Sequence, residues 1–163
     1  MERRQIGVKL VMDQLGLPVR VESFADRLVL QKAVYLAQAA GVDLGYYYRW
    51  YVRGPYCPSV TDDGFCIATE LSQNVDDSEG WTFDKVSSQR LAGIRDFVAR
   101  LDSASLAKKL ELFASVHFLI DRKQVPGRSP EKIAALLKKF GKDFDASDVS
   151  AALGGLRDYG IIR

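Results

Sequence analysis

The stretch SLAKKLELFASVHFLID, residues 105–121, carries the strongest helical pattern in the chain. Its apolar positions alternate steps of four and three, which places them on one side of a helix. They are Leu106, Leu110, Phe113, His117 and Ile120. Further leucine and valine residues widen this side and leave little polar surface. We therefore expect this helix to lie at the centre of the fold, covered by its neighbours.

Around this helix, apolar residues at helical spacing predict six more helices, whose ends are marked by glycine, proline or capping side chains. Five are expected at about residues 6–15, 24–40, 58–71, 87–101 and 130–140, and Asp145 or Ser147 caps the last one. A glycine stop and a short apolar tail at residues 159–162 fit a short strand. The expected fold class is mainly α: a compact helical domain with a small β-hairpin or strand and a winged-helix-like C-terminal part.

The small β element is predicted by LGYYYRWYVRGPYCP, residues 44–58. Aromatic residues at this density favour a strand, here residues 45–53, and Gly54-Pro55 ends it with a turn. The period of two then divides the side chains between two faces. The face expected to join the core holds Tyr46, Tyr48, Trp50 and Val52. The other face, called the aromatic–arginine face below, holds Tyr47, Arg49, Tyr51 and Arg53. Either a second layer of the fold covers this face and buries the phenols, or the face is open and binds an acidic protein partner or stacks unpaired bases.

Composition limits the classes of partner. The chain of 163 residues carries a net charge of +2, too close to neutral for a non-specific nucleic-acid binder. Cys57 and Cys66 match no zinc spacing and only one histidine accompanies them, so we expect no metal and no cofactor. No stretch approaches the roughly 20 apolar residues that span a bilayer, and residues 1–17 are charged and amphipathic, unlike a signal peptide. We expect a cytoplasmic protein without a membrane partner.

Two neighbouring segments resemble a known family. LVLQKAVYLAQ, residues 28–38, followed by YYYRWYVRGPYCPSV, residues 46–60, is similar to the Panacea (SocA-like) antitoxin group, and more closely to its YwgA-like relatives. The distinctive matching residues are Gln31, Lys32, Tyr35, Trp50, Gly54, Pro55 and Tyr56. Two departures alter what the turn would recognise: Arg53 stands where an aromatic residue is usual, and Cys57 stands where serine is usual.

The resemblance implies a role in protein contact. Panacea-type domains are associated with toxin–antitoxin pairs, in which they neutralise a toxin by binding it, and one branch delivers the toxin to a protease. YwgA-like relatives are associated with mobile or phage-defence gene neighbourhoods. Neither group is tied to a catalytic constellation. The resemblance also divides the expected single domain, residues 1–163, into a Panacea/YwgA-like core at 1–103 and a helical, winged-helix-like subdomain at 104–163.

The residues with reactive side chains have structural interpretations. His117 is the only histidine, and its place on an apolar helix face favours a buried neutral imidazole with a hydrogen-bond partner. Cys57 precedes a helix but has no base near it in sequence to activate the thiol. Asp62 and Asp63 are expected to serve a helix N-terminus rather than Mg²⁺. We therefore expect no catalytic residue and no enzyme.

The C-terminal segment allows a nucleic-acid alternative. A winged helix that reads DNA carries Arg, Lys, Asn or Gln on the outer face of its second helix. Here the last helix offers two acidic residues against one basic residue, which is unfavourable for phosphate. Gly154-Gly155 inside this helix costs about 2 kcal/mol relative to two alanines and predicts close packing.

The sequence thus favours a non-catalytic protein-interaction module, antitoxin-like or associated with defence systems or mobile elements. Its partner would be a protein, such as a toxin or a defence-system component, bound through the aromatic–arginine face and the Gly-Pro turn. Arg49 and Arg53 would pair with carboxylates, while Tyr47, Tyr51 and Tyr56 supply contact area. The alternatives are a nucleic-acid-binding accessory or transcriptional regulator that uses the C-terminal helices, and, third, an enzyme that uses Cys57 or His117.

Overall fold

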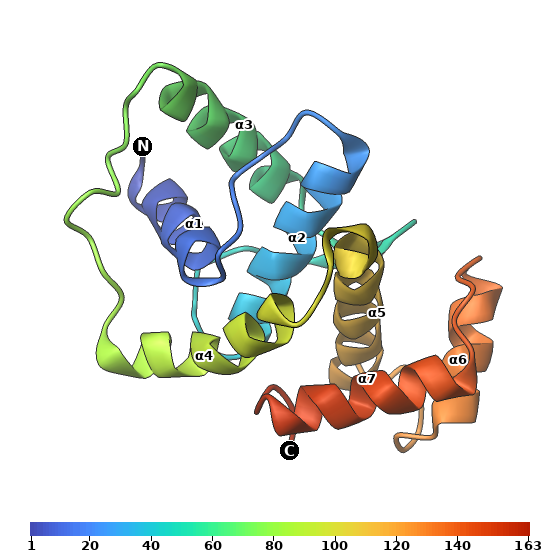
Figure 1. Ribbon diagram of the computed structural model, residues 1–163. Helices are drawn as coiled ribbons and strands as arrows, with labels where there is room; N and C mark the ends of the chain where they lie inside the picture. Colours follow the sequence, from blue (N-terminus) through green and yellow to red (C-terminus); the bar gives the residue numbers. More distant parts are fainter.

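The computed structural model describes residues 1–163 and confirms a mainly helical fold with one small antiparallel sheet (Figure 1). Seven helices and two strands follow in chain order: α1 Arg3–Gln14, α2 Phe24–Ala39, β1 Arg49–Tyr51, β2 Gly54–Tyr56, α3 Pro58–Ser72, α4 Lys85–Ala99, α5 Ser103–Asp121, α6 Pro130–Lys139 and α7 Ala146–Asp158. None of these helices combines the length and the apolar character that a bilayer crossing needs.

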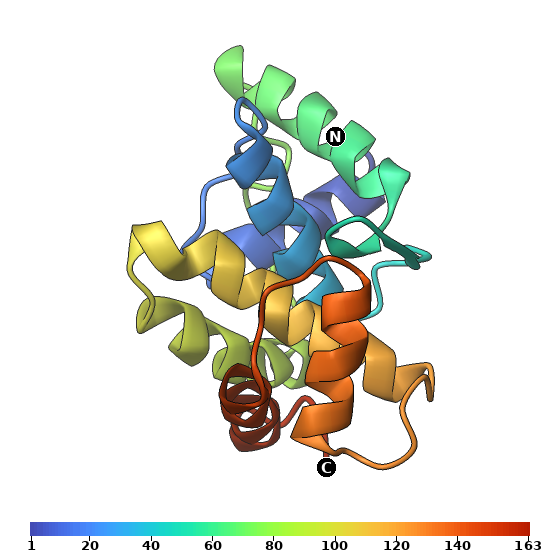
Figure 2. The ribbon, with the colours of Figure 1, turned by 90° about the vertical axis from the view of Figure 1, so that its right-hand side faces the viewer.

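Helix α5 lies at the centre, as its sequence predicts (Figures 1 and 2). It packs against α2 on one side, against α7 on another, and against strand β2. Every residue from Leu110 to Leu119 is buried, the polar ones included. A single cluster of 37 buried hydrophobic residues runs from Val8 to Leu156. Helix α5 packs against α2, which precedes it in the chain, and against α7, which follows it. One continuous core therefore joins residues 1–103 with residues 104–163.

The helix ends follow the sequence in two cases and depart from it in a third. Ser23 begins α2 with a complete capping box, and Asp145 does the same for α7. Helix α3 begins at Pro58, where the sequence predicts it, but its N-cap is Cys57, so Ser59 and Asp62, whose spacing suggests a capping box, lie inside the helix. No side chain caps α3; the proline, whose fixed φ suits the first helical position, marks its start.

The aromatic segment forms a shorter strand than predicted. Regular pairing is limited to β1 and β2, with Arg49 opposite Tyr56 and Tyr51 opposite Gly54. The chain therefore reverses at Val52-Arg53, and Gly54-Pro55 belongs to the second strand. Tyr46 and Tyr48 are buried as expected, but the prediction for Val52 is wrong: its side chain is 66% exposed. The reason is the turn, since the alternation of faces holds only while the backbone stays extended.

The C-terminal part contains the two helices of the predicted winged-helix-like arrangement without its strand. Residues 159–163 form a turn and an irregular end after α7, so the expected strand at 159–162 is absent. The close packing predicted for the glycine pair is found at Gly155, where an added Cβ would lie 2.6 Å from Cζ of Phe113. Gly154 has nothing within 4 Å of that position, so only one of the two glycines is explained by packing.

Candidate functional site

All four residues of the aromatic–arginine face are exposed, which decides between the two alternatives that the sequence leaves open, an open face and a face covered by a second layer. Tyr47 and Tyr51 are 66% and 63% exposed, which is unusual for large aromatic side chains. They face outward because their neighbours are fixed inward. The Tyr46 hydroxyl donates to Oδ2 of Asp63 at 2.6 Å, and the Tyr48 hydroxyl lies 3.4 Å from the carbonyl oxygen of Gln31.

The two arginines of this face lie against aromatic rings and have no carboxylate partner within the chain. The guanidinium carbon of Arg49 is 5.8 Å from the centre of the Tyr47 ring. That of Arg53 is 5.7 Å from the ring of Phe24, which begins α2 and is itself exposed. Stacking of this kind orients a guanidinium while its N–H groups remain available. The face therefore offers two oriented and unpaired cations.

The remaining predicted residues lie around the hairpin with different roles. Tyr56 is half-buried, and its ring centre is 5.6 Å from that of Tyr51. Trp50 packs inward against Phe118 and Phe140, with ring centres 5.7 and 4.8 Å away. Tyr56 thus joins the exposed face, whereas Trp50 anchors the hairpin to the C-terminal helices.

Gln31 connects α2 to the start of α3. Its side-chain Nε2 donates to the Cys57 carbonyl at 2.7 Å and to Oγ1 of Thr61 at 2.8 Å, while its Oε1 accepts from the Cys57 backbone N–H at 3.1 Å. The buried side-chain amide of Gln31 therefore bonds both the backbone N–H and the carbonyl oxygen of Cys57, the residue that follows β2. Cys57 itself is buried at this junction, which agrees with a structural role for its side chain.

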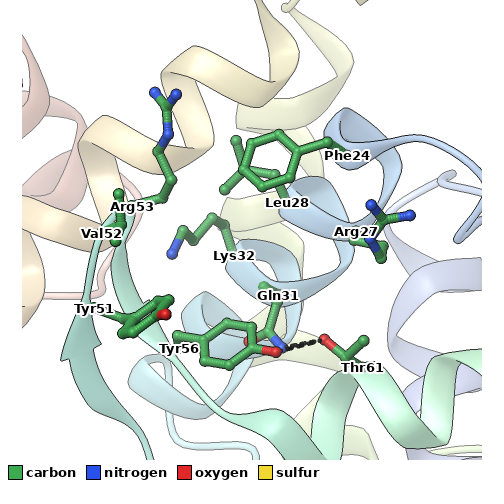
Figure 3. A pocket seen from close by; sticks show the side chains of 10 residues that line it. All are labelled: Phe24, Arg27, Leu28, Gln31, Lys32, Tyr51, Val52, Arg53, Tyr56 and Thr61. Carbon is green, nitrogen blue, oxygen red and sulfur yellow. Dashed lines mark hydrogen bonds between the residues drawn. The ribbon is translucent and has the colours of Figure 1, made fainter.

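A cavity of about 430 Å³ opens beside the hairpin, between it and the start of α2 (Figure 3). We call it the Lys32 pocket. Its lining is formed by Phe24, Arg27, Leu28, Gln31, Lys32, Tyr51, Val52, Arg53, Tyr56 and Thr61. Three of these residues are cationic and none is acidic, so the pocket has a positive potential. The sequence predicts neither this cavity nor the contribution of Phe24.

Lys32 is almost completely buried, with 1% of its surface exposed. Its Nζ donates to the carbonyl oxygen of Pro55 at 2.6 Å, the only hydrogen bond that the ammonium makes. Burial lowers the pKa of Lys32 from 10.5 to about 7, because a charged amine loses its hydration there. In the sequence, Lys32 stands out only as a residue of the family-like motif.

A second buried lysine lies behind the hairpin. Nζ of Lys142 donates to Oε1 of Glu111 at 2.5 Å and lies 3.3 Å from the carbonyl oxygen of Val52. Burial lowers the pKa of Lys142, and the Glu111 carboxylate opposes that shift. Glu111 also acts electrostatically on Lys32. One buried carboxylate thus pairs with Lys142 and acts at longer range on Lys32, and the three groups together carry a net positive charge when both lysines are protonated.

His117 occupies the buried site that its helical position predicts. Its Nδ1 is 2.6 Å from the hydroxyl of Tyr35, the motif tyrosine of α2. Burial lowers the pKa of His117, which favours the neutral imidazole. No group of three or more His, Cys, Asp or Glu side chains is placed to hold a metal ion.

Asp63 connects three segments rather than serving the N-terminus of α3. Its carboxylate accepts hydrogen bonds from Nε of Arg4, Nε2 of Gln5 and the hydroxyl of Tyr46. Burial alone raises the pKa of Asp63, but these three hydrogen bonds outweigh it and the pKa falls below 3.8. Asp62, one position earlier, is exposed and makes no such contact.

Replacing Asp63 with asparagine is expected to lower the free energy of unfolding by about 1–2 kcal/mol at pH 7. The exposed Asp62→Asn is the matched control and should leave it unchanged. Because the folded-state pKa of Asp63 is depressed, its stabilisation is present above pH 3.8 and is lost as the pH falls through the folded-state pKa. Urea denaturation across this range measures the difference, and equal stability of wild type and Asp63→Asn at pH 7 would contradict it.

The outer face of α7 provides little for nucleic acid. Its exposed residues are Ser147, Ser150, Ala151, Arg157 and Asp158. Arg157 is the one cation among them, and the acidic Asp158 follows it directly in the sequence. Comparison with protein-family models, with curated proteins and with solved structures finds no match to this chain. The resemblance to Panacea and YwgA-like proteins therefore stays a prediction from the motif residues.

Proposed function

We propose that this protein is a non-catalytic interaction module of the antitoxin-like or defence-associated kind, which binds a partner protein through the aromatic–arginine face and Tyr56. The observation that carries the proposal is the exposure of two large tyrosines that alternate with two arginines without carboxylate partners. Tyr and Arg dominate the binding energy of protein interfaces, because they combine contact area with directed hydrogen bonds.

The chemistry of the face specifies the kind of partner. Exposed Phe24 and Val52 continue the apolar surface beside Tyr51. Arg49 and Arg53 supply positive charge, and no acidic side chain pairs with either of them. A complementary surface would carry carboxylates next to large apolar side chains. Arginines at the rim of such an interface mainly accelerate association and make it sensitive to salt.

The double variant Tyr51→Ala/Arg53→Ala is expected to abolish partner capture while the protein stays folded, because both side chains are exposed and lie at the hairpin turn. Tagged wild-type and variant proteins would be used to capture proteins from the native host, followed by identification of the captured proteins by mass spectrometry. Affinity for the captured protein, once purified, should also fall with added salt.

Trp81→Ala/Arg3→Ala is the matched control, since it removes an exposed aromatic residue and an exposed arginine at the other side of the molecule. Capture should survive in this control. Undiminished capture by the folded Tyr51→Ala/Arg53→Ala protein would show that another surface binds the partner. The identity of the protein encoded by the adjacent open reading frame is a further inexpensive guide to the partner.

A further inference from the structure

The walls of the Lys32 pocket are apolar and aromatic. Phe24 and Leu28 lie on one side, Tyr51 and Tyr56 lie on the other, and the Lys32 side chain extends between them toward the hairpin (Figure 3). The cavity volume of about 430 Å³ falls within the range of small-molecule sites. Walls of this kind suit a flat or branched apolar body, which would replace water against the rings.

One buried cation lies at the end of these walls. The Lys32 ammonium has three N–H donors, and only the carbonyl oxygen of Pro55 accepts from it. The hydroxyl of Ser115 is also buried without a partner, and an added Cβ at Gly54 would lie 2.4 Å from that oxygen and 3.7 Å from Nζ of Lys32. Buried polar groups are normally satisfied. The unused donors of Lys32 therefore indicate an acceptor supplied from outside the chain.

The charge of that acceptor follows from the other cations of the pocket. The Arg27 guanidinium is already engaged, since its Nη1 donates to the carbonyl oxygens of Val21 and Glu22. Arg53 lies at the mouth, where its guanidinium points away from Lys32 (Figure 3). One buried ammonium neutralises one negative charge, so a monoanion fits better than a phosphate with two charges.

We propose that the Lys32 pocket is a binding site for a small carboxylic acid with a flat or branched apolar body. The carboxylate accepts hydrogen bonds from the Lys32 ammonium, and the apolar body packs between Phe24 and the tyrosines of the hairpin. This site goes beyond the proposed partner contact, because its ligand is a free small molecule and its occupation requires no protein partner.

The protonation of Lys32 gives the site a pH dependence. A bound carboxylate favours the charged amine, so binding above pH 7 takes up a proton and weakens as the pH rises. The charged and titratable groups around Lys32 are Arg27 on α2, Glu111 on α5, Lys142 after α6, and Tyr51, Arg53 and Tyr56 on the hairpin. In a variant without the Lys32 amine, any pH dependence of binding that remains comes from these other groups.

The test uses benzoate, phenylacetate and 3-phenylpropionate as probes, each beside its uncharged amide. Titration of the full chain, followed by calorimetry and by the chemical shifts of the backbone N–H groups, should give saturable binding of at least one acid. That acid should bind about tenfold tighter than its uncharged amide, because one charge-assisted hydrogen bond contributes about that factor to affinity. Lys32→Met should lower affinity for the acid by about the same factor and leave affinity for the amide unchanged. The wild-type affinity for the acid should fall between about pH 7 and about pH 9.

Lys85→Met is the matched control, since Lys85 is an exposed lysine on α4, and it should retain wild-type affinity. Saturable binding of none of the three acids would overturn the proposal, as would equal affinity for acid and amide. Binding of the acid that is unchanged in Lys32→Met would also overturn it. Because no partner protein is present in these titrations, their failure is distinct from failure of the capture experiment.

Discussion

Replacing Glu111 with glutamine is expected to lower the free energy of unfolding by about 3 kcal/mol or more at pH 7, because loss of one member of a buried ion pair leaves the other charge without compensation. In this protein the effect extends to two cations. Lys142 donates to Glu111 at 2.5 Å, and Lys32 is also stabilised by its charge. Glutamine has nearly the shape of glutamate, so the variant tests the charge rather than the packing.

Chemical denaturation of Glu111→Gln beside Glu79→Gln measures this loss. Glu79 is exposed and makes no ion pair, so its replacement should change stability by less than about 0.5 kcal/mol. The deficit of Glu111→Gln should shrink as the pH rises, since uncharged lysines no longer need the carboxylate. A deficit below about 1 kcal/mol at pH 7 would mean that water already compensates these charges.

Lys32→Met is expected to have the opposite effect and to raise the free energy of unfolding by roughly 2–4 kcal/mol at pH 7. The pKa of Lys32 is 10.5 as a free side chain and about 7 in the fold. That difference corresponds to a cost of roughly 5 kcal/mol for burying the amine. Methionine has a similar length and no charge, so the variant avoids this cost. It leaves the Pro55 carbonyl without a hydrogen-bond donor, however, and this loss offsets about 1–3 kcal/mol of the gain in stability.

The pH dependence distinguishes this cost from an effect of packing. Between pH 7 and pH 10.5 the unfolded chain binds a proton at Lys32 that the folded chain has released, so wild-type stability rises with pH in this window. The advantage of Lys32→Met should therefore be largest at or below pH 7 and disappear toward pH 10.5. Denaturation of both proteins at several pH values provides the measurement.

A destabilised Lys32→Met would show that the lysine is a support for the hairpin, through its bond to Pro55. A stabilised variant would show that the folded protein retains a charge that it does not need for folding. Groups of that kind are characteristic of binding sites, where stability and function compete. The sign of one stability measurement thus bears directly on the proposed acid site.

The sequence by itself determined the helical architecture and the division of the aromatic segment into two faces, whereas only the structure showed that the aromatic–arginine face is open. The apolar pattern of residues 105–121 was sufficient to place α5 at the centre, because a helix with so little polar surface must be covered. The same pattern placed His117 in the interior. Alternation along the hairpin correctly separated buried Tyr46 and Tyr48 from exposed Tyr47 and Tyr51, because successive side chains of an extended chain point to opposite sides.

Only the tertiary structure decided where that alternation ends and which charges are buried. Val52 is exposed because β1 pairs with β2 and forces the reversal at that residue. Lys32 and Glu111 are buried by residues distant in sequence, such as Pro55 and Lys142, which lie 23 and 31 positions away from them respectively. A local pattern records whether a side chain is polar, whereas its burial, its partners and its pKa depend on what the fold places around it.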